Sequence, residues 1–207
     1  MYIIGITGGV GSGKTFVTEK TAELIKDKKV CKLITDDIGD RLMQPGEVCF
    51  NRILEVFSRD VLVNPLDENS GLDKALIARI VFKDPDKKRV LEEIIHPAVT
   101  DEINRVLEEE KESDTFILLE SALLIEAHID KLCDETWFVY TDSEIRRERL
   151  KESRNYSDEK IDSIMRNQKA DEFYLEHCDH TVRNNGSVDE TVNNILELLE
   201  SIDGNQG

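Results

Sequence analysis

Residues 2–15 of the chain read YIIGITGGVGSGKT, in which a short β-rich run meets a glycine-rich turn that ends in lysine and threonine. The turn, residues 8–15, matches the pattern G-x-x-x-x-G-K-[ST] of phosphate-binding loops. Residues 14–28 then place apolar side chains at helical spacing. The loop therefore follows an expected strand and opens an expected helix, and this context favours a phosphate-binding loop over an ordinary glycine-rich turn.

Each residue type in this loop has a chemical reason. Glycines let successive backbone N–H groups face one anion, and the amino end of the helix adds positive potential. Lys14 can reach the β- and γ-phosphates of a nucleotide, and the Thr15 hydroxyl can ligate Mg²⁺. We therefore predict a site for ATP and Mg²⁺ whose nucleotide-binding residues are Gly8, Gly9, Gly11, Ser12, Gly13, Lys14, Thr15 and Phe16.

The rest of the chain alternates strand and helix patterns. Further strands are expected at 30–34, 116–119, 136–140 and 180–182, with long helical patterns at 85–111, 143–153, 158–168 and 187–202. Several strands are continuously apolar, which is typical of a parallel sheet covered on both faces. We expect the α/β, three-layer fold of P-loop NTPases with a five-stranded parallel sheet. At His96-Pro97 we expect a helix boundary or a kink, because the residue before proline resists helix.

We expect one domain over residues 1–207, with three parts. The core would comprise about 1–37, 113–142 and 178–203. A helical insertion would occupy about 38–112, and a helical lid would occupy about 143–177.

The composition of the chain argues against some kinds of binding partner and indicates a cellular compartment. The chain has 207 residues, with 27 basic and 44 acidic side chains and a net charge of −17. So acidic a protein repels nucleic acid and anionic membranes at long range, whereas a local cluster of cations can still bind a small anion. We expect no nucleic-acid partner, no membrane span and no secretion signal. Cys31, Cys49, Cys133 and Cys178 lie far apart, which indicates reduced thiols in a cytoplasmic protein.

Three groups of charged residues leave two interpretations each. Thr35-Asp36-Asp37 follows the second expected strand, where a carboxylate can hold Mg²⁺ or accept a proton, or can cap the next helix. Glu120 at the end of the third strand is either a Mg²⁺-site carboxylate or a capping group. The last group can clamp phosphates, or can form i,i+4 pairs with Glu144, Glu148 and Glu152; its members are Arg146, Arg147, Arg149, Arg154 and Arg166.

An ordered set of segments resembles the dephospho-coenzyme A kinase family over about residues 2–200. The segments are Gly5 to Thr15, Ile34 to Ile38 with Arg41 and Pro45-Gly46, Arg79 to Phe82, Asp84-Pro85, His96-Pro97, Leu123 to Glu126, Gln168, and Asp179 through Asn185-Gly186. The phosphate loop alone is common to many kinases, whereas the ordered set is far more specific.

The resemblance implies a reaction and roles for several residues. The reaction is transfer of the ATP γ-phosphate to the ribose 3′-hydroxyl of dephospho-CoA. By this resemblance Asp37 is the catalytic base, Arg149 is an arginine near the phosphates, and Asn185-Gly186 is a turn near the adenine. Asp37, Arg41 and His96 are implied to bind the acceptor. We expect a monomer or a weak homo-oligomer.

The chain departs from the family pattern at four places. Thr35 stands where the family usually has Asp, and Ala122 stands where it usually has proline. The register around Ser153-Arg154-Asn155 shifts by up to one residue, and Ala170-Asp171-Glu172 stands where the family often has an arginine.

Three alternatives stay open at this point. The first is a P-loop kinase for a nucleoside, a nucleoside monophosphate or a sugar. The second is a GTP-dependent switch, which Asp36 to Gly39 superficially fits, although the chain has no Asn-Lys-x-Asp motif. The third is a chain that keeps the fold and has lost activity.

Overall fold

The computed structural model describes residues 1–205, with every side chain in that range except those of residues 68 and 203–205. Within this range, five parallel strands form one sheet in the order β2-β3-β1-β4-β5. The strands are Tyr2–Thr7 (β1), Lys29–Ile34 (β2), Thr115–Glu120 (β3), Glu135–Tyr140 (β4) and His180–Arg183 (β5). The predicted five-stranded parallel sheet is therefore confirmed.

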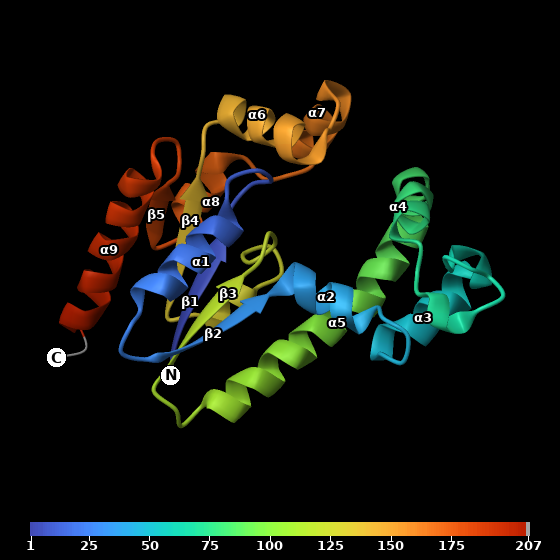
Figure 1. Cartoon of the computed structure of the whole chain (residues 1–207), viewed down its shortest axis with the longest axis horizontal. Coiled ribbons are helices and arrows are strands. Elements are labelled where there is room, and N and C mark those ends of the chain that lie inside the picture. Colours follow the sequence, from blue (N-terminus) through green and yellow to red (C-terminus); the bar gives the residue numbers. More distant parts are fainter. Residues whose placement is uncertain (206–207) are drawn as a thin grey trace. The chain divides into compact units, whose positions relative to one another are not determined.

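Helices connect these strands (Figure 1). The α-helices are Lys14–Leu24 (α1), Thr35–Leu42 (α2), Val48–Phe57 (α3), Lys74–Lys83 (α4), Pro85–Glu110 (α5), Ser143–Arg154 (α6), Asp158–Arg166 (α7), Asp171–His177 (α8) and Val188–Asn205 (α9). Short 3₁₀ turns occupy Arg59–Val61 (η1), Glu68–Ser70 (η2) and Ile129–Leu132 (η3).

Of the boundary or kink expected at His96-Pro97, the boundary is wrong, because α5 continues through Pro97. The kink stays a prediction. Proline removes one backbone hydrogen bond from a helix interior. Burial on both sides of Pro97 offsets this loss. Ile94 is buried, and its carbonyl accepts a hydrogen bond from the Cys49 thiol. Val99 is buried and lies close to Gly39 of α2.

The core of the sheet follows the two-residue period of its strands. Alternate residues of β1, β3 and β4 face α1 and α9, which contact each other on one side of the sheet. This cluster contains Ile4, Ile6, Val17, Phe116, Leu118, Trp137, Val139, Val182, Ile195 and Ile202. Trp137 is therefore a core residue. The other face presents Phe138, whose ring stacks on Tyr174 of α8 with 5.1 Å between centroids.

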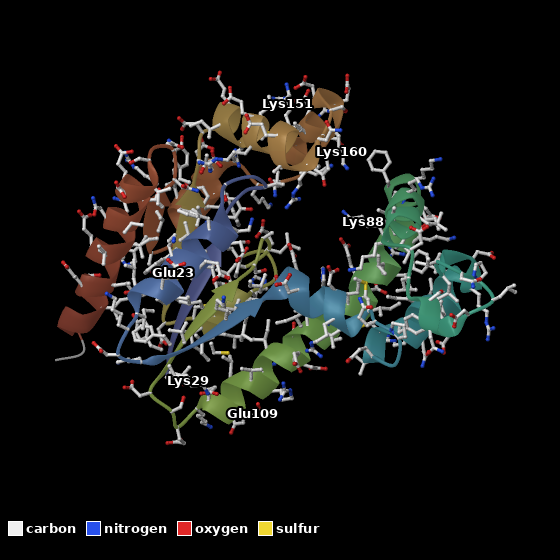
Figure 2. All side chains as sticks on the ribbon, viewed as in Figure 1. Glu23, Lys29, Lys88, Glu109, Lys151 and Lys160 are labelled. Atoms are coloured by element: carbon white, nitrogen blue, oxygen red, sulfur yellow. The ribbon has the colours of Figure 1, made fainter. Side chains whose placement is uncertain are left out.

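The chain folds into two compact units. One unit comprises Met1–Ile34 with Glu112–Gly207 and holds the sheet, and the other comprises Thr35–Lys111 and holds α2 to α5. Charged side chains are exposed on both α6 and α7, among them Lys151 of α6, which pairs with Asp158 at 2.7 Å, and Lys160 of α7 (Figure 2). None of the helices in residues 1–205 has the length and apolar composition that crossing a membrane would require.

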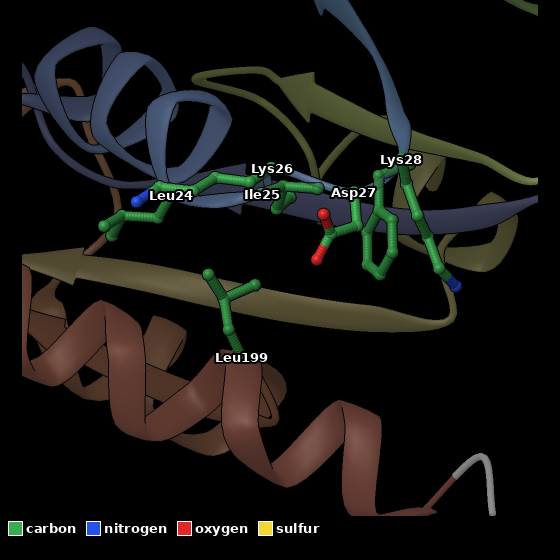
Figure 3. A pocket seen from close by; sticks show the side chains of 7 residues that line it. Leu24, Ile25, Lys26, Asp27, Lys28 and Leu199 are labelled. Atoms are coloured by element: carbon green, nitrogen blue, oxygen red, sulfur yellow. The ribbon is translucent and has the colours of Figure 1, made fainter.

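A cavity of about 360 Å³ opens in the first unit at the amino ends of the strands, where α1 leads into β2. Leu199 of α9 projects toward Ile25 in this cavity, and Lys26, Asp27 and Lys28 line its edge (Figure 3). The phosphate loop follows the carboxyl end of β1, which is the opposite end of the same sheet. The cavity is therefore separate from the predicted nucleotide site.

Candidate active site

The phosphate loop lies between β1 and α1, and Gly11 and Gly13 have backbone conformations that other residues rarely adopt. Gly11 has φ +78° and Gly13, which precedes α1, has φ +89°. Gly11 also lies against the first turn of α6. A Cβ at this position would lie 3.0 Å from the Arg146 carbonyl oxygen and 3.1 Å from Leu150 Cγ. Glycine is thus required for both the backbone angle and the close approach of α6.

One carbonyl group anchors the middle of the loop. The Ser12 oxygen accepts hydrogen bonds from Asn184 Nδ2 at 2.7 Å, Thr141 Oγ1 at 2.9 Å and Arg149 Nη1 at 3.4 Å. Because a trans peptide holds its C=O and N–H in opposite directions, fixing this oxygen inward turns the Gly13 N–H outward. An outward row of N–H groups is what an anion site needs.

Lys14 and Thr15 lie at the start of α1. The Lys14 ammonium donates to the carbonyl oxygens of Gly8 at 3.0 Å and Gly9 at 3.4 Å, so it folds back over the loop. The Thr15 hydroxyl donates to Glu120 Oε1 at 2.8 Å, and the Thr18 hydroxyl donates to Oε2 at 3.0 Å. Glu120 is 5% exposed. Its carboxylate thus lies beside the predicted Mg²⁺ ligand.

Two arginines of α6 bind to segments outside their own helix. Arg147 pairs with Asp158 at 3.0 Å and with Asp162, both on α7, rather than with the glutamates of its own helix. The Arg149 guanidinium donates to Ser12 O and, at 2.9 Å, to Asn184 O. Arg149 therefore holds the phosphate loop through the carbonyl oxygens of Ser12 and Asn184. The i,i+4 pairs with Glu144, Glu148 and Glu152 are absent among residues 1–205, because α6 turns its arginines toward other segments.

The second unit contains the residues that the resemblance assigns to the acceptor. Asp36 and Asp37 are exposed in the first turn of α2, directly after β2. Arg41 pairs with Glu102 at 2.5 Å and with Glu47 at 3.7 Å. This ion pair joins α2 to α5. His96 is exposed on α5, and its carbonyl oxygen accepts a hydrogen bond from Thr100.

Glu102 receives a second arginine. A hydrogen bond from Arg105, with the nearby charge of Arg41, lowers the pKa of the Glu102 carboxyl below its ordinary value. Arg105 donates to Glu102 Oε2 at 2.9 Å. Glu102 therefore stays ionised as the partner of both arginines.

The residues predicted near the adenine have structural contacts of their own. Asn185 Oδ1 accepts a hydrogen bond from the Asp142 N–H at 2.8 Å, which ties the β5–α9 turn to the start of α6. Gly186 lies so close to the Glu190 carboxylate that a side chain there would overlap it. Phe16 packs its ring against the apolar core, so only its backbone is available to a phosphate.

Four residues hold the loop, and the sequence pattern gave a role only to Arg146, as a candidate phosphate clamp. Asn184, 5% exposed, and Thr141 fix the Ser12 carbonyl. Gln168 Oε1 accepts a hydrogen bond from the Val10 N–H at 3.0 Å, and the Arg146 guanidinium lies against Gly9. Their positions at the carboxyl ends of β4 and β5, or beside quoted segments, were the only available signal.

Replacing Gly11 with alanine should destabilise the protein by about 1–2 kcal/mol from the left-handed backbone, plus a further loss from contact with α6. Gly46 is the matched control, because it has φ +90° and nothing within 4 Å of an added Cβ. Chemical denaturation of both variants measures the difference. Equal destabilisation by Gly11→Ala and Gly46→Ala would show that the close approach of α6 contributes nothing.

Comparison with known proteins identifies a family that matches most of the chain. The family model described as dephospho-CoA kinase matches residues 2–190. This chain belongs to the dephospho-CoA kinase family. The match includes the phosphate loop, the helical segment 35–111 and the arginines of α6, so it covers far more than the loop that many kinases share.

Individual proteins are similar to this chain over nearly its whole length. A dephospho-CoA kinase from Symbiobacterium thermophilum is 32% identical over 208 residues, covering 100% of this chain and 84% of that protein. One from Bacillus cereus is 30% identical and covers 96% of each chain. The solved structure of TT1252 from Thermus thermophilus has a TM-score of 0.75 and 27% identity, covering 97% of this chain and 96% of that one.

Proposed function

We propose that this chain phosphorylates dephospho-CoA on its ribose 3′-hydroxyl at the expense of ATP. The observation that carries the acceptor's identity is the family match over residues 2–190, which includes both the loop and the helical segment 35–111. The loop supports the nucleotide half of the reaction, because its glycines and Lys14 form an anion site. Another small-molecule kinase would share the loop but not this match.

The transfer step needs a nucleophile, an electrophile and a proton acceptor. The ribose 3′-oxygen attacks the γ-phosphorus, the new O–P bond forms, and the bond from the γ-phosphorus to its bridging oxygen breaks to release ADP. The proton of the hydroxyl passes to the Asp37 carboxylate. Lys14 stabilises charge on the β- and γ-phosphates. Arg149 holds the phosphate loop in place and adds positive charge near the phosphates.

The oxygen atoms around α1 fit a magnesium ion. Thr15 supplies a hydroxyl, and the Glu120 carboxylate accepts its hydrogen bond at 2.8 Å, which is the hard-oxygen chemistry that Mg²⁺ requires. We assign the Thr15 oxygen as ligand and Glu120 as the group that orients it. When bound, the ion neutralises charge on the phosphates.

Other assignments complete the proposal. The helical segment 38–112, with Arg41 and His96, binds the acceptor, and the Asn185-Gly186 turn lies near the adenine. The four cysteines lie far apart in the sequence, which supports a cytoplasmic location. We further propose a monomer or a weak homo-oligomer.

A panel of acceptors with Mg·ATP tests the proposed function. The panel contains dephospho-CoA, AMP, uridine, shikimate and gluconate. Dephospho-CoA should give the highest kcat/KM, and replacing ATP with GTP should lower the rate. A higher kcat/KM for any other acceptor would contradict the proposal.

Closure of segment 143–177 over the bound substrates is a further expected outcome. An open site would let water take the phosphoryl group, so a kinase needs a cover. Backbone hydrogen exchange in residues 143–168 should slow when a non-hydrolysable ATP analogue and CoA are both present. The described helix α9 is the internal reference, since its exchange should change little. Unchanged exchange throughout 143–168 would contradict a lid.

A further inference from the structure

Arg146 lies directly on the phosphate loop. Gly9 has no side chain, and the Arg146 guanidinium takes the space that a Cβ would fill there. The Arg146 side chain is 11% exposed. It comes from the first turn of α6, whose backbone also touches Gly11. The contact is therefore built into the packing of α6 on the loop.

The guanidinium of Arg146 is incompletely satisfied. Its Nε is buried and has no hydrogen-bond partner within residues 1–205. Its ion-pair partner in the described chain is Asp171 of α8, with Nη2 and Oδ1 3.5 Å apart. A charge-assisted hydrogen bond between such groups is about 2.7–2.9 Å long. The pair is thus a loose one, and Arg146 retains donor capacity at the loop.

The position of Lys14 indicates where the donor groups of Arg146 lie relative to a bound nucleotide. The Lys14 ammonium donates to the carbonyl oxygens of Gly8 and Gly9. The Lys14 ammonium and the Arg146 guanidinium therefore both lie at Gly9. The lysine of this motif reaches the β- and γ-phosphates. A guanidinium at the same glycine therefore lies at the terminal-phosphate end of the site.

The charges of Arg146 and Asp171 both act on the Tyr140 hydroxyl. A hydrogen bond with Asp142 raises the pKa of the Tyr140 hydroxyl, the charge of Asp171 adds to this rise, and the charge of Arg146 opposes it. The side chain of Asp171 is 27% exposed. Asp171 is therefore accessible to solvent and can release its partner without being left buried.

We propose that Arg146 binds the terminal phosphate of ATP and that Asp171 is its counter-ion in the nucleotide-free protein. This inference rests on the proposed function only in placing a nucleoside triphosphate in the loop. The phosphate displaces Asp171, because a bidentate arginine–phosphate contact is stronger than a loose pair near the surface. Asp171 consequently opposes ATP binding, and its removal should strengthen that binding.

Calorimetric titration with Mg·ATP and Mg·ADP, without acceptor, tests both residues. Arg146→Gln should weaken Mg·ATP binding by at least roughly tenfold, with a smaller change for Mg·ADP, which lacks the terminal phosphate. Asp171→Asn should tighten Mg·ATP binding by about twofold to fivefold. Arg147→Gln and Glu172→Gln are matched controls that change the same charges on adjacent residues, and both should leave the Mg·ATP affinity near wild type.

Two results would overturn the proposal. One is Arg146→Gln with unchanged Mg·ATP affinity, or with equal losses for Mg·ATP and Mg·ADP. The other is Asp171→Asn with unchanged or weaker Mg·ATP binding, which decides the matter alone if Arg146→Gln does not fold. Failure of the proposed function is a separate result: dephospho-CoA would not be phosphorylated although Mg·ATP binds and responds to these variants.

Discussion

Replacing Lys14 with alanine is expected to lower kcat by about 10²–10³-fold, as the loss of one preorganised charge at a transition state does. The Lys14 ammonium lies over the loop, 3.0 Å from the Gly8 carbonyl oxygen, and we propose that it stabilises negative charge on the transferring phosphate. The free energy of unfolding should change little. Alanine has the highest helix propensity, and Lys14 begins α1.

Lys20→Ala is the control for this substitution. Lys20 lies on the same helix and pairs with Glu23 at 2.6 Å on the surface. The Lys20→Ala variant should have a kcat near wild type. Its free energy of unfolding should also change little, since exposed pairs contribute at most about 1 kcal/mol to stability. Steady-state kinetics and thermal denaturation of both variants decide the matter. If Lys14→Ala turns over at a rate close to wild type, the phosphate site is assigned to the wrong residues.

Asp37→Asn is expected to lower kcat by about 10²–10⁴-fold, the usual contribution of a general base. A ribose hydroxyl has a very high pKa, so its proton needs an acceptor as the oxygen attacks. Asparagine keeps the shape of the side chain and a hydrogen bond but cannot accept that proton. If the transition state is loose, the loss lies at the low end of this range, because Asp37 then acts mainly by positioning. KM for dephospho-CoA should stay within a few-fold of wild type.

Asp36→Asn is the matched control, because Asp36 and Asp37 are adjacent, exposed and in the same turn of α2. It should reduce kcat far less than Asp37→Asn. Mg²⁺ must be titrated in both variants, since a metal-binding role for Asp37 would lower the apparent metal affinity as well. A larger loss of kcat for Asp36→Asn would refute Asp37 as the base. The alignment of the residues after β2 with the family would then have to be redrawn.

Strands β1, β3 and β4 could be predicted from sequence because each is a short, largely apolar run whose local pattern decides its structure. The run from Phe116 to Leu119 is buried, and Trp137 lies in the core, as its apolar neighbours indicated. Pro97 shows the limit of local rules. The residue before proline resists helix, yet burial of Ile94 and Val99 keeps α5 continuous.

The phosphate loop could be located from its motif, whereas the groups that hold it could not. Asn184 and Thr141 are about 130 to 170 residues from Ser12 in sequence, and they meet its carbonyl only because parallel strands bring their carboxyl ends together. The charge pattern of α6 was similarly ambiguous. Arg147 and Arg149 are two residues apart, yet one pairs with α7 and the other with the loop, because a helix turns them to different sides.

The position of the new phosphate tests the central claim most directly. Purified protein is incubated with dephospho-CoA and Mg·ATP, and the product is examined by ³¹P and ¹H NMR, with ADP measured in parallel. We predict one new phosphomonoester on the ribose 3′-oxygen, formed in equal amount to ADP. A phosphate on another oxygen, or ADP released without a phosphorylated acceptor, would contradict the account.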